Sequence, residues 1–408
     1  MSDVEEAVIQ AHHAEWARVV AALTRRFGDL DIAEDAAAEA FATAVERWPA
    51  DGVPPNPGGW LATTANRKAI DRIRRENKRD DKHKAAQLLY DDDPHEPRDA
   101  IDDERLRLIF TCCHPALGME TRVALTLRMV AGLTVPEIAR AFLVQESTMG
   151  QRITRAKAKI TAARIPYRVP SAEDLPARVS GVLAVLFLVF NEGYLATGPD
   201  TDPVRHDLTA EAIRLTRLIR ALLPEDGEVA GLLALRILTE ARRTARVSTS
   251  GELVTLDEQD RGAWDAALIA EGHRLVRERL AAGVAPGRYQ ILAAISAVHT
   301  SARDVRDTDW SQIVALYDLL VRLDPSPIIA LNRAVAVAEL DGPEVALAAV
   351  DRLEDKLAGY HAYHATRADL LRRVGCSQKS RAAYDKAIEL AGNTAETAYL
   401  TRRRDQLG

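Results

Sequence analysis

The stretch 132–160, GLTVPEIARAFLVQESTMGQRITRAKAKI, constrains the fold of this chain more than any other. Its pattern predicts two short helices joined by a tight turn. Pro136 suits the first turn of a helix, where its missing N–H costs nothing. Thr134 is placed to cap that helix, and Glu137 completes a capping box. The layout is typical of a helix-turn-helix, in which the second helix enters the major groove of DNA.

The second of these helices is expected to begin at Ser147 or Thr148 and to carry an unusual excess of positive charge. Residues 142–160 contain four Lys or Arg against one acid, and residues 105–170 contain 11 against 3. Basic side chains beside a recognition helix bind phosphates, while Gln and Arg contact base edges. A plain helical hairpin is the alternative. The side chains predicted to face outward are Gln151, Arg152, Arg155, Lys157 and Lys159.

Length and composition predict a multidomain all-α protein. The 408 residues are sufficient for two to four domains, and 47% of them are apolar and 28% charged. Alternating β-branched patterns are rare, which favours helices throughout. Three Cys and an N-terminus without a signal peptide pattern indicate a reducing, cytoplasmic location and no membrane span. We expect the most apolar run, 179–190, to form a buried helix.

Charge is divided into blocks along the chain. Residues 1–51 have 11 acids and 4 bases, whereas residues 66–79 have 7 bases and 2 acids. Residues 80–104 have 10 acids and 3 bases, with two Pro and no apolar periodicity, so we expect an acidic flexible linker. Blocks of opposite sign predict separate surfaces for separate partners.

The N-terminal segment predicts three helices. The first covers 1–27, and Gly28 ends it. The second follows a cap at Asp29 or Asp31 and extends to Trp48. Its outer face is either an ordinary solvated surface or a docking surface for a basic partner. The acids expected on that face are Glu34, Asp35, Glu39 and Glu46.

A loop and a basic helix follow. The loop, 49–59, has four Pro and three Gly, so we expect neither helix nor strand. The helix begins at Trp60. An aromatic residue ahead of cations suits single-stranded nucleic acid, because cations follow phosphates and the aromatic holds an unstacked base. A solvated basic helix end is the alternative. The polar residues beside the apolar stripe are Asn66, Arg67, Asp71, Arg74 and Arg75.

No residue pattern predicts catalysis, a metal or a cofactor. Cys112, Cys113 and His114 are adjacent, but neighbouring cysteines rarely ligate one zinc ion and no second ligand pair follows. His361 and His364 lack a neighbouring acid or Cys. We expect packing roles for all five, and because phosphate loops and nucleophile motifs are also absent from the sequence, we expect no enzyme.

The segment 171–408 predicts helix after helix, over roughly 175–190, 205–223, 226–245, 257–282, 286–302, 309–323, 326–340, 343–355, 360–374 and 377–391. A 34-residue period appears near its end, where Ala334 and Ala346 recur as Ala368 and Ser380. This period is typical of tetratricopeptide repeats, which stack helix pairs into a surface that binds peptides or proteins. Chance self-similarity among helices is the alternative.

Three parts of the sequence resemble a known family. DLDIAEDAAAEAFATAVERWP followed by GGWLATTANRKAIDRIRRENKR resembles region 2 of bacterial sigma-70-family factors, and LTLRMVAGLTVPEIARAFLVQESTMGQRITRAKAKI resembles region 4. This order resembles the extracytoplasmic-function (ECF) layout. FTCCHPAL and LVFNEGYLATG resemble the ECF subgroup with a tetratricopeptide-like C-terminal extension. The resemblance implies region 2 at 1–79, a linker at 80–104, region 4 at 105–168 and an extension at 171–408, repeat-like from about 305.

The resemblance also implies roles for individual residues. Many family members have Gly in the turn where this chain has Leu143, so the angle between the two helices is open. The helix at 31–48 would dock on core RNA polymerase through Asp31, Glu34, Asp35, Glu39 and Phe41. The next helix would melt and recognise the −10 element through Asn66, Arg67, Asp71, Arg74 and Arg75. The −35 element would be contacted by Thr148, Gln151, Arg152, Arg155 and Lys157.

The sequence therefore predicts a sigma factor that binds core RNA polymerase and promoter DNA and starts transcription of a specific regulon. Its own C-terminal extension would regulate it, with a protein or peptide as a partner of the repeats. One alternative is a helix-turn-helix regulator with a repeat-type sensor domain that acts without polymerase. Another is a repeat scaffold whose N-terminal helices form only an interaction module.

Overall fold

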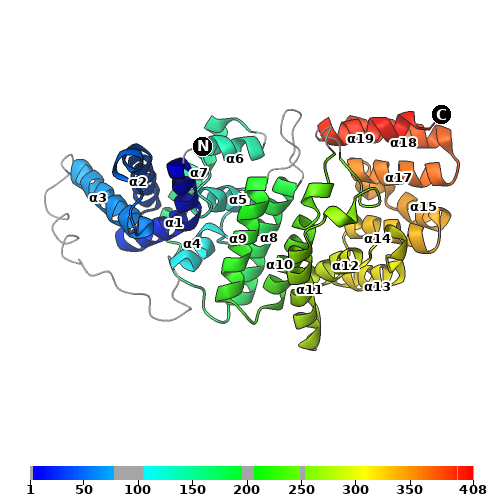
Figure 1. Ribbon diagram of the computed structural model, residues 1–408, viewed down its shortest axis with the longest axis horizontal. Helices are drawn as coiled ribbons and strands as arrows, with labels where there is room; N and C mark the ends of the chain where they lie inside the picture. The colour runs from blue at the N-terminus through cyan, green and yellow to red at the C-terminus, as the bar shows by residue number, and fades with distance from the viewer. Residues whose placement is uncertain are drawn as a thin grey trace. The chain divides into compact units, whose positions relative to one another are not determined.

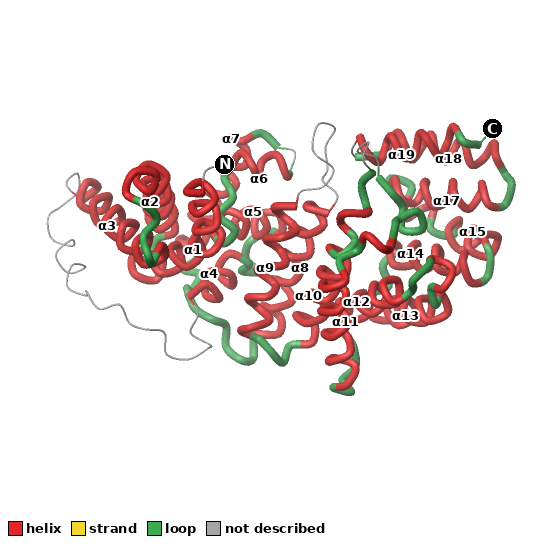
Figure 2. The backbone as a smooth tube through the Cα atoms, viewed as in Figure 1, coloured by secondary structure: helices red, strands yellow, loops and turns green. Residues whose placement is uncertain are grey.

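The computed structural model describes residues 3–77, 104–142, 144–194, 206–248, 253–392 and 394–407. Within these ranges every regular element is a helix, and the β-structure consists of one isolated bridge between Val247 and Leu253. Figure 2 shows helices joined by loops. The all-α prediction is confirmed. The chain forms two compact units, residues 1–188 and 189–408. Residues 80–103 of the linker expected at 80–104 lie outside the described residues, and so does the turn residue Leu143.

Unit 1 begins with three helices that pack on one another, α1 (Asp3–Phe27), α2 (Leu30–Asp51) and α3 (Pro57–Asn77) (Figure 1). Gly28 has a φ of 67°, which ends α1 in the left-handed region that Gly adopts without strain. The Asp29 carboxylate then accepts hydrogen bonds from two amides of the first turn of α2.

The predicted loop at 49–59 is shorter in the structure. Helix α2 continues past Pro49 to Asp51, and α3 starts at Pro57 rather than at Trp60. Pro57 occupies the first helical position, which needs no N–H donor, and Asn56 accepts a hydrogen bond from the Gly59 amide at 2.9 Å. The Pro-rich composition therefore marks two helix ends rather than a loop across all eleven residues.

Four helices follow in unit 1, α4 (Glu104–Cys112), α5 (Met119–Met129), α6 (Val135–Ala141) and α7 (Glu146–Ala162). The capping box forms as predicted, because the Glu137 carboxylate accepts from the Thr134 amide at 2.7 Å. Helix α7 begins one residue before Ser147. Gln145 is its N-cap and makes no side-chain cap bond, so the expected opening at Ser147 or Thr148 is slightly wrong. Cys112 and Cys113 are buried in the core.

Helix α8 (Leu175–Tyr194) contains the most apolar run and extends beyond the predicted 179–190. Among the described residues it is the one helix long and apolar enough to match a membrane span by length and composition. About two-fifths of that window is buried inside the protein (39%). Its buried face includes Val182, Leu186 and Phe190, whereas Leu188 is exposed.

Most of unit 2 consists of further helices. The helix predicted at 226–245 ends early, at Glu240. The helix predicted at 257–282 begins late, at Ala266, where Asp265 caps it. The last helix was not predicted. The helices are α9 (His206–Leu222), α10 (Gly227–Glu240), α11 (Ala266–Ala281), α12 (Arg288–Ser301), α13 (Trp310–Leu323), α14 (Pro327–Leu340), α15 (Pro343–Asp351), α16 (Glu354–Leu357), α17 (His361–Arg373), α18 (Ser377–Leu390) and α19 (Thr394–Asp405).

The 34-residue period has a counterpart in the packing of α13 to α19. Ala334, Ala346, Ala368 and Ser380, the small residues that repeat, are all buried where helices pack closely. Ion pairs recur with nearly the same spacing. Asp318 of α13 pairs with Arg333 of α14 at 2.6 Å, and Asp351 of α15, 33 residues after Asp318, pairs with Arg367 of α17 at 2.7 Å. Each helix pair is thereby tied to the next, as in a stacked repeat.

Candidate nucleic-acid interface

One face of helix α2 packs against the core, and the opposite face is turned to solvent. Its small apolar residues pack inward, and Phe41 joins them, with its ring centroid 5.7 Å from Trp16 and 4.9 Å from His12. Asp31 and Glu39 are exposed, and Asp35 is half-buried. Of the five residues expected to dock on a partner, Asp31, Asp35 and Glu39 therefore lie at the surface of this structure.

Glu34 is only 6% exposed and sits in a cluster of ion pairs that joins α2 to α5 and α7. Arg128 Nε lies 2.5 Å from its carboxylate, and Lys157 Nζ forms a second ion pair with it. Lys157 Nζ also donates to Asp31 at 2.8 Å. Burial alone would lower the pKa of Lys157, but the Glu34 and Asp31 carboxylates raise it above its ordinary value. Lys157 is therefore charged and fully paired.

The outward positions expected for Glu34 and Lys157 are wrong in this structure. Lys157 is 7% exposed and lies on the side of α7 that faces α2. The physical reason is that four methylenes can be buried while the ammonium reaches a carboxylate that is also buried. A count of charges along α7 cannot reveal this, because the partner carboxylate is more than a hundred residues away in the sequence.

Aromatic residues of α1 reinforce the same contact. The Trp16 indole donates to the Met129 carbonyl at 3.1 Å, and Arg128 lies over its ring. Gly132 has a φ of 79°, and a Cβ there would meet the His12 ring at 2.5 Å, so only Gly fits. Burial lowers the pKa of His12 to about 4, which keeps its ring neutral.

On helix α3, unlike at Glu34 and Lys157, most of the charged side chains remain accessible, because the apolar stripe is the face that packs on α1 and α2. Leu61, Ala65 and Ala69 are buried, and Trp60 packs edge-on against Trp48 at 5.6 Å. Asn66 is half-buried. The exposed residues are Arg67, Asp71, Arg74 and Arg75.

Residues of α2 and α3 line a hollow of about 510 Å³. Glu39 and Lys68 lie on one part of its lining, 3.5 Å apart, and Asp71, Arg74 and Arg75 complete it. The long Arg74–Asp71 pair, 3.9 Å at the surface, holds Arg74 weakly. The structure thus places three of the predicted −10 residues beside one predicted docking residue.

Helix α7 retains an exposed face opposite to Lys157. Thr148, Gln151 and Arg155 are exposed along it, and Arg155 Nε donates to the Gln151 carbonyl at 3.2 Å. Arg152 is half-buried and pairs with Glu120 at 3.0 Å. Thr154 is exposed between Gln151 and Arg155 and was missed. Its spacing, three residues after Gln151 on a helix, is the signal that would have found it.

Cys112 and Cys113 pack in the core. Both thiols are buried, and burial raises the pKa of Cys113 to about 11. Over the ranges that the structure describes, no three His, Cys, Asp or Glu side chains are grouped to hold an ion.

Comparisons with known families match three segments. Residues 12–79 match Sigma-70 region 2, residues 107–160 match Sigma-70 region 4, and residues 178–280 match a family of unknown function, DUF6596. The first two segments contain α3 and α7, the two helices with the exposed polar faces described above.

Comparisons with individual proteins agree. The chain is 44% identical to the uncharacterized protein R00370 of Rhizobium meliloti over 398 residues, which is 96% of this chain and 93% of that protein. It is 30% identical to a probable ECF RNA polymerase sigma factor, SigI, of Mycobacterium tuberculosis over 171 residues, 41% of this chain and 58% of that protein. No solved structure matches the chain. The C-terminal helical extension of the chain includes the segment that matches DUF6596. The chain therefore belongs to the extracytoplasmic-function group of the sigma-70 family, whose members are transcription initiation factors rather than enzymes.

Proposed function

We propose that this protein directs core RNA polymerase to a specific set of promoters, with α2 as the polymerase-docking helix. The exposed carboxylates of Asp31 and Glu39 and the half-buried carboxylate of Asp35 support this assignment, because they form an acidic surface next to the basic α3. Glu34 and Phe41 would support the same helix from within, through their packing. Core polymerase and promoter DNA are then its partners, and we expect it in the cytoplasm.

Promoter recognition is assigned to two helices with different chemistry. Helix α3 offers Arg67, Arg74 and Arg75 to the phosphates of a melted −10 strand. Helix α7 offers Thr148, Gln151 and Arg155 to base edges of a duplex −35 element, since Gln and Arg form bidentate contacts with A and G. The observation that carries the proposal is that both exposed faces fall in the two matched sigma regions.

The Lys157 cluster adds a condition to this proposal. Asp31 remains exposed while it accepts a hydrogen bond from Lys157, but Lys157 cannot meet a phosphate while it is buried against Glu34. In the described arrangement α2 therefore closes off Lys157, and its use at DNA requires α2 and α7 to separate.

The test is transcription in vitro with core polymerase and the full-length chain. Specific start sites are expected, together with co-purification of the chain with core enzyme. A helix-turn-helix regulator that acts without polymerase would bind duplex DNA and fail both assays. A repeat scaffold would show neither polymerase binding nor DNA binding with a steep dependence on salt.

We further propose that the C-terminal extension regulates initiation and that its stacked helices bind a protein or peptide. The periodic ion pairs and buried small residues support a repeat surface there. A chain with a disrupted repeat, for example Ala368→Arg, is expected to alter promoter output in the same assay while α2, α3 and α7 keep their sequence.

A further inference from the structure

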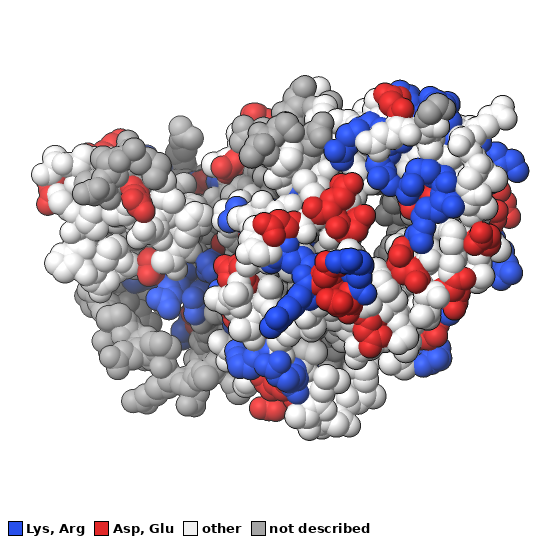
Figure 3. Space-filling view, turned by 45° about the vertical axis from the view of Figure 1, so that its right-hand side comes forward, with Lys and Arg blue, Asp and Glu red and all other residues white. Residues whose placement is uncertain are grey.

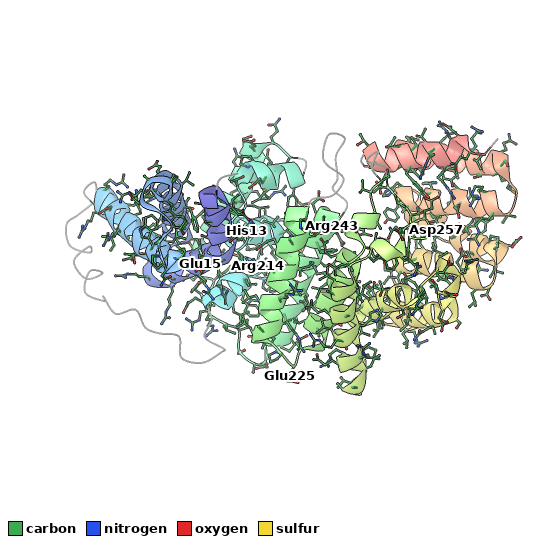
Figure 4. All side chains as sticks on the ribbon, in the orientation of Figure 1. His13, Glu15, Arg214, Glu225, Arg243 and Asp257 are labelled. Atoms are coloured by element: carbon green, nitrogen blue, oxygen red, sulfur yellow. The ribbon has the colours of Figure 1, made fainter. Side chains whose placement is uncertain are left out.

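Unit 2 has an open cavity of about 320 Å³ that the proposed polymerase and DNA contacts do not use. It lies between the end of α8, Arg242 and Arg246, the segment 253–259, and the helices α17 and α19. Figure 4 labels Asp257, which belongs to that segment. The volume is at the lower end of the range of about 300–1,000 Å³ that holds small organic ligands.

The most buried polar group in the lining is the guanidinium of Arg246. The residue is 7% exposed, its Nη1 donates to the Tyr194 carbonyl at 2.7 Å, and its Cζ lies 3.2 Å from the centroid of the Tyr194 ring. A carbonyl and a ring fix its position, and no carboxylate of the described part of the chain lies within ion-pairing distance. Buried charges in proteins are usually paired, so this cation lacks its ordinary counterpart.

Arg242 contributes a second cation to the same lining. Its Nε is buried without a hydrogen-bond partner, and over the described ranges the side chain makes no ion pair. This contrasts with unit 2 as a whole, where acidic and basic side chains are interspersed and many are paired (Figure 3). Two neighbouring guanidiniums without carboxylates form a site for an anion, since a planar fork of donors matches a carboxylate.

The opposite wall holds one acid that is already paired. His361 pairs with Glu396 at 3.2 Å, and this contact raises the pKa of His361, so its ring compensates the carboxylate. Arg242 and Arg246 therefore leave the lining positive, which favours an anion.

The rest of the lining is apolar. Leu253, Leu256 and Leu400 line the cavity, and Tyr399 adds an aromatic face. A ligand with an apolar body would exclude water there and gain from burial of its surface.

We propose that this cavity binds a carboxylate carried on a small apolar body, with Arg242 and Arg246 facing the carboxylate and Leu253, Leu256 and Leu400 around the body. Two sources share this chemistry, a free organic acid and the C-terminal carboxylate of a peptide. The site is distinct from the DNA and polymerase surfaces, so its test needs neither.

The experiment is calorimetric titration of the full-length chain with hydrocinnamate and, as the uncharged match, hydrocinnamide. A parallel arm uses acetyl-Ala-Leu-Phe with a free or an amidated C-terminus. A probe of this size is expected to bind with a Kd on the order of 1 mM or tighter in its acid form. Binding of hydrocinnamate assigns the free acid as source, and binding of the peptide acid alone assigns the peptide.

The variant Arg242→Gln should weaken binding of the acid by about tenfold to a hundredfold, because it removes a charge-assisted contact. Arg243→Gln is the matched control. Arg243, labelled in Figure 4, is adjacent in sequence but pairs with Glu240 at 3.0 Å and lines a different cavity. Its variant should bind the acid as the wild type does.

Three results would overturn the proposal: no binding of either acid, equal binding of each acid and its amide, or a loss of affinity in Arg243→Gln that matches the loss in Arg242→Gln. Thermal unfolding of both variants is measured alongside. If Arg242→Gln unfolds early, Arg242→Lys, which keeps the charge, must restore part of the affinity for the assignment to stand.

Discussion

Helices α3 and α7 are both basic helices of the sigma regions, yet they differ in what their cations do. On α3, Arg67, Arg74 and Arg75 remain exposed, whereas Lys68 and Arg72 pair with Glu39 and Asp35 of α2. On α7, Lys157 is buried against acids of α2, and Arg152 pairs with Glu120. Positive charge in a sequence therefore measures how many cations are present, whereas the structure decides how many of them are free for DNA.

The two helices also differ in whether their DNA-binding cations are already exposed. Helix α3 needs no rearrangement within unit 1 to expose its arginines. Helix α7 exposes Gln151 and Arg155, but its contribution through Lys157 depends on breaking contacts with Asp31 and Glu34. These contacts also join α2 to α7, so separation of the two helices would free Lys157 for DNA.

The largest effect is expected from Glu34→Ala. The change leaves Arg128 without its carboxylate and Lys157 with Asp31 alone, and breaking a buried pair in this way costs about 3–5 kcal/mol of unfolding free energy. Urea unfolding of the full chain measures the loss. Glu39→Ala is the control, because Glu39 is exposed and its pair with Lys68 is worth less than about 1 kcal/mol. Equal losses in the two variants would show that the cluster does not hold α2 to α7.

The second prediction concerns pH and the aromatic contact beside that cluster. Burial lowers the pKa of His12 from 6.5 to about 4, with Arg128 and His13 lowering it further and Glu137 opposing them. The unfolded chain therefore binds the proton first. The stabilisation from the neutral ring is complete above pH 6.5 and decreases by about 1.4 kcal/mol per pH unit as the pH falls toward 4.

His12→Leu provides the comparison for this prediction. Urea unfolding at pH 7 and pH 5 should show a smaller difference between the two conditions for the variant than for the wild type. His299 in unit 2 has its pKa lowered to about 4 by burial as well, and it is unchanged in both proteins, so it cancels from the comparison. Identical pH dependence of wild type and variant would contradict the assignment to His12.

Local signals in the sequence were sufficient for much of this fold. The Thr134–Glu137 capping box and the Gly28 helix end depend on residues within a few positions, and both formed as predicted. The exposed positions of Gln151 and Arg155 followed from the sequence pattern of α7, whereas Thr148 was implied by the family resemblance. The same pattern placed Lys157 outside, and the structure buries it.

The errors come from partners that are distant in the sequence. Lys157 was expected outside because its partner, Glu34, lies in another helix, and nothing near either residue shows that both are buried. The ligand cavity of unit 2 was missed for the same reason, since Arg246 and Tyr399 meet only in the folded chain. Helix boundaries shifted where Pro49 remained inside a final turn and where Asp265 capped α11 late.

The third prediction compares base contacts with phosphate contacts on α7. Gln151→Ala is expected to lower the affinity of the holoenzyme for its preferred −35 element by about 1–3 kcal/mol and to relax the preference at one base pair. Lys159→Ala should instead weaken binding to all sequences alike, because Lys159 lies on the exposed basic side of the helix. Competition binding with promoter variants separates the two. A uniform loss for Gln151→Ala would place that residue on phosphates rather than bases.

The smallest effect on stability is expected on α3. Arg75→Ala should change the free energy of unfolding by less than about 0.5 kcal/mol, because Arg75 is exposed and, among the described residues, donates only to the Asp71 carbonyl of its own helix, at 3.3 Å. Its effect should appear in DNA binding. Loss of one contact to a single strand lowers the slope of log K against log salt by about 0.7. The measurement is holoenzyme binding to a pre-melted −10 template over a range of salt concentrations. Lys157→Met is the comparison, since Lys157 is buried against α2 on a helix outside the −10 site, and the variant should leave that slope unchanged. An unchanged slope for Arg75→Ala would remove the distinction between the free cations of α3 and the paired cation of α7.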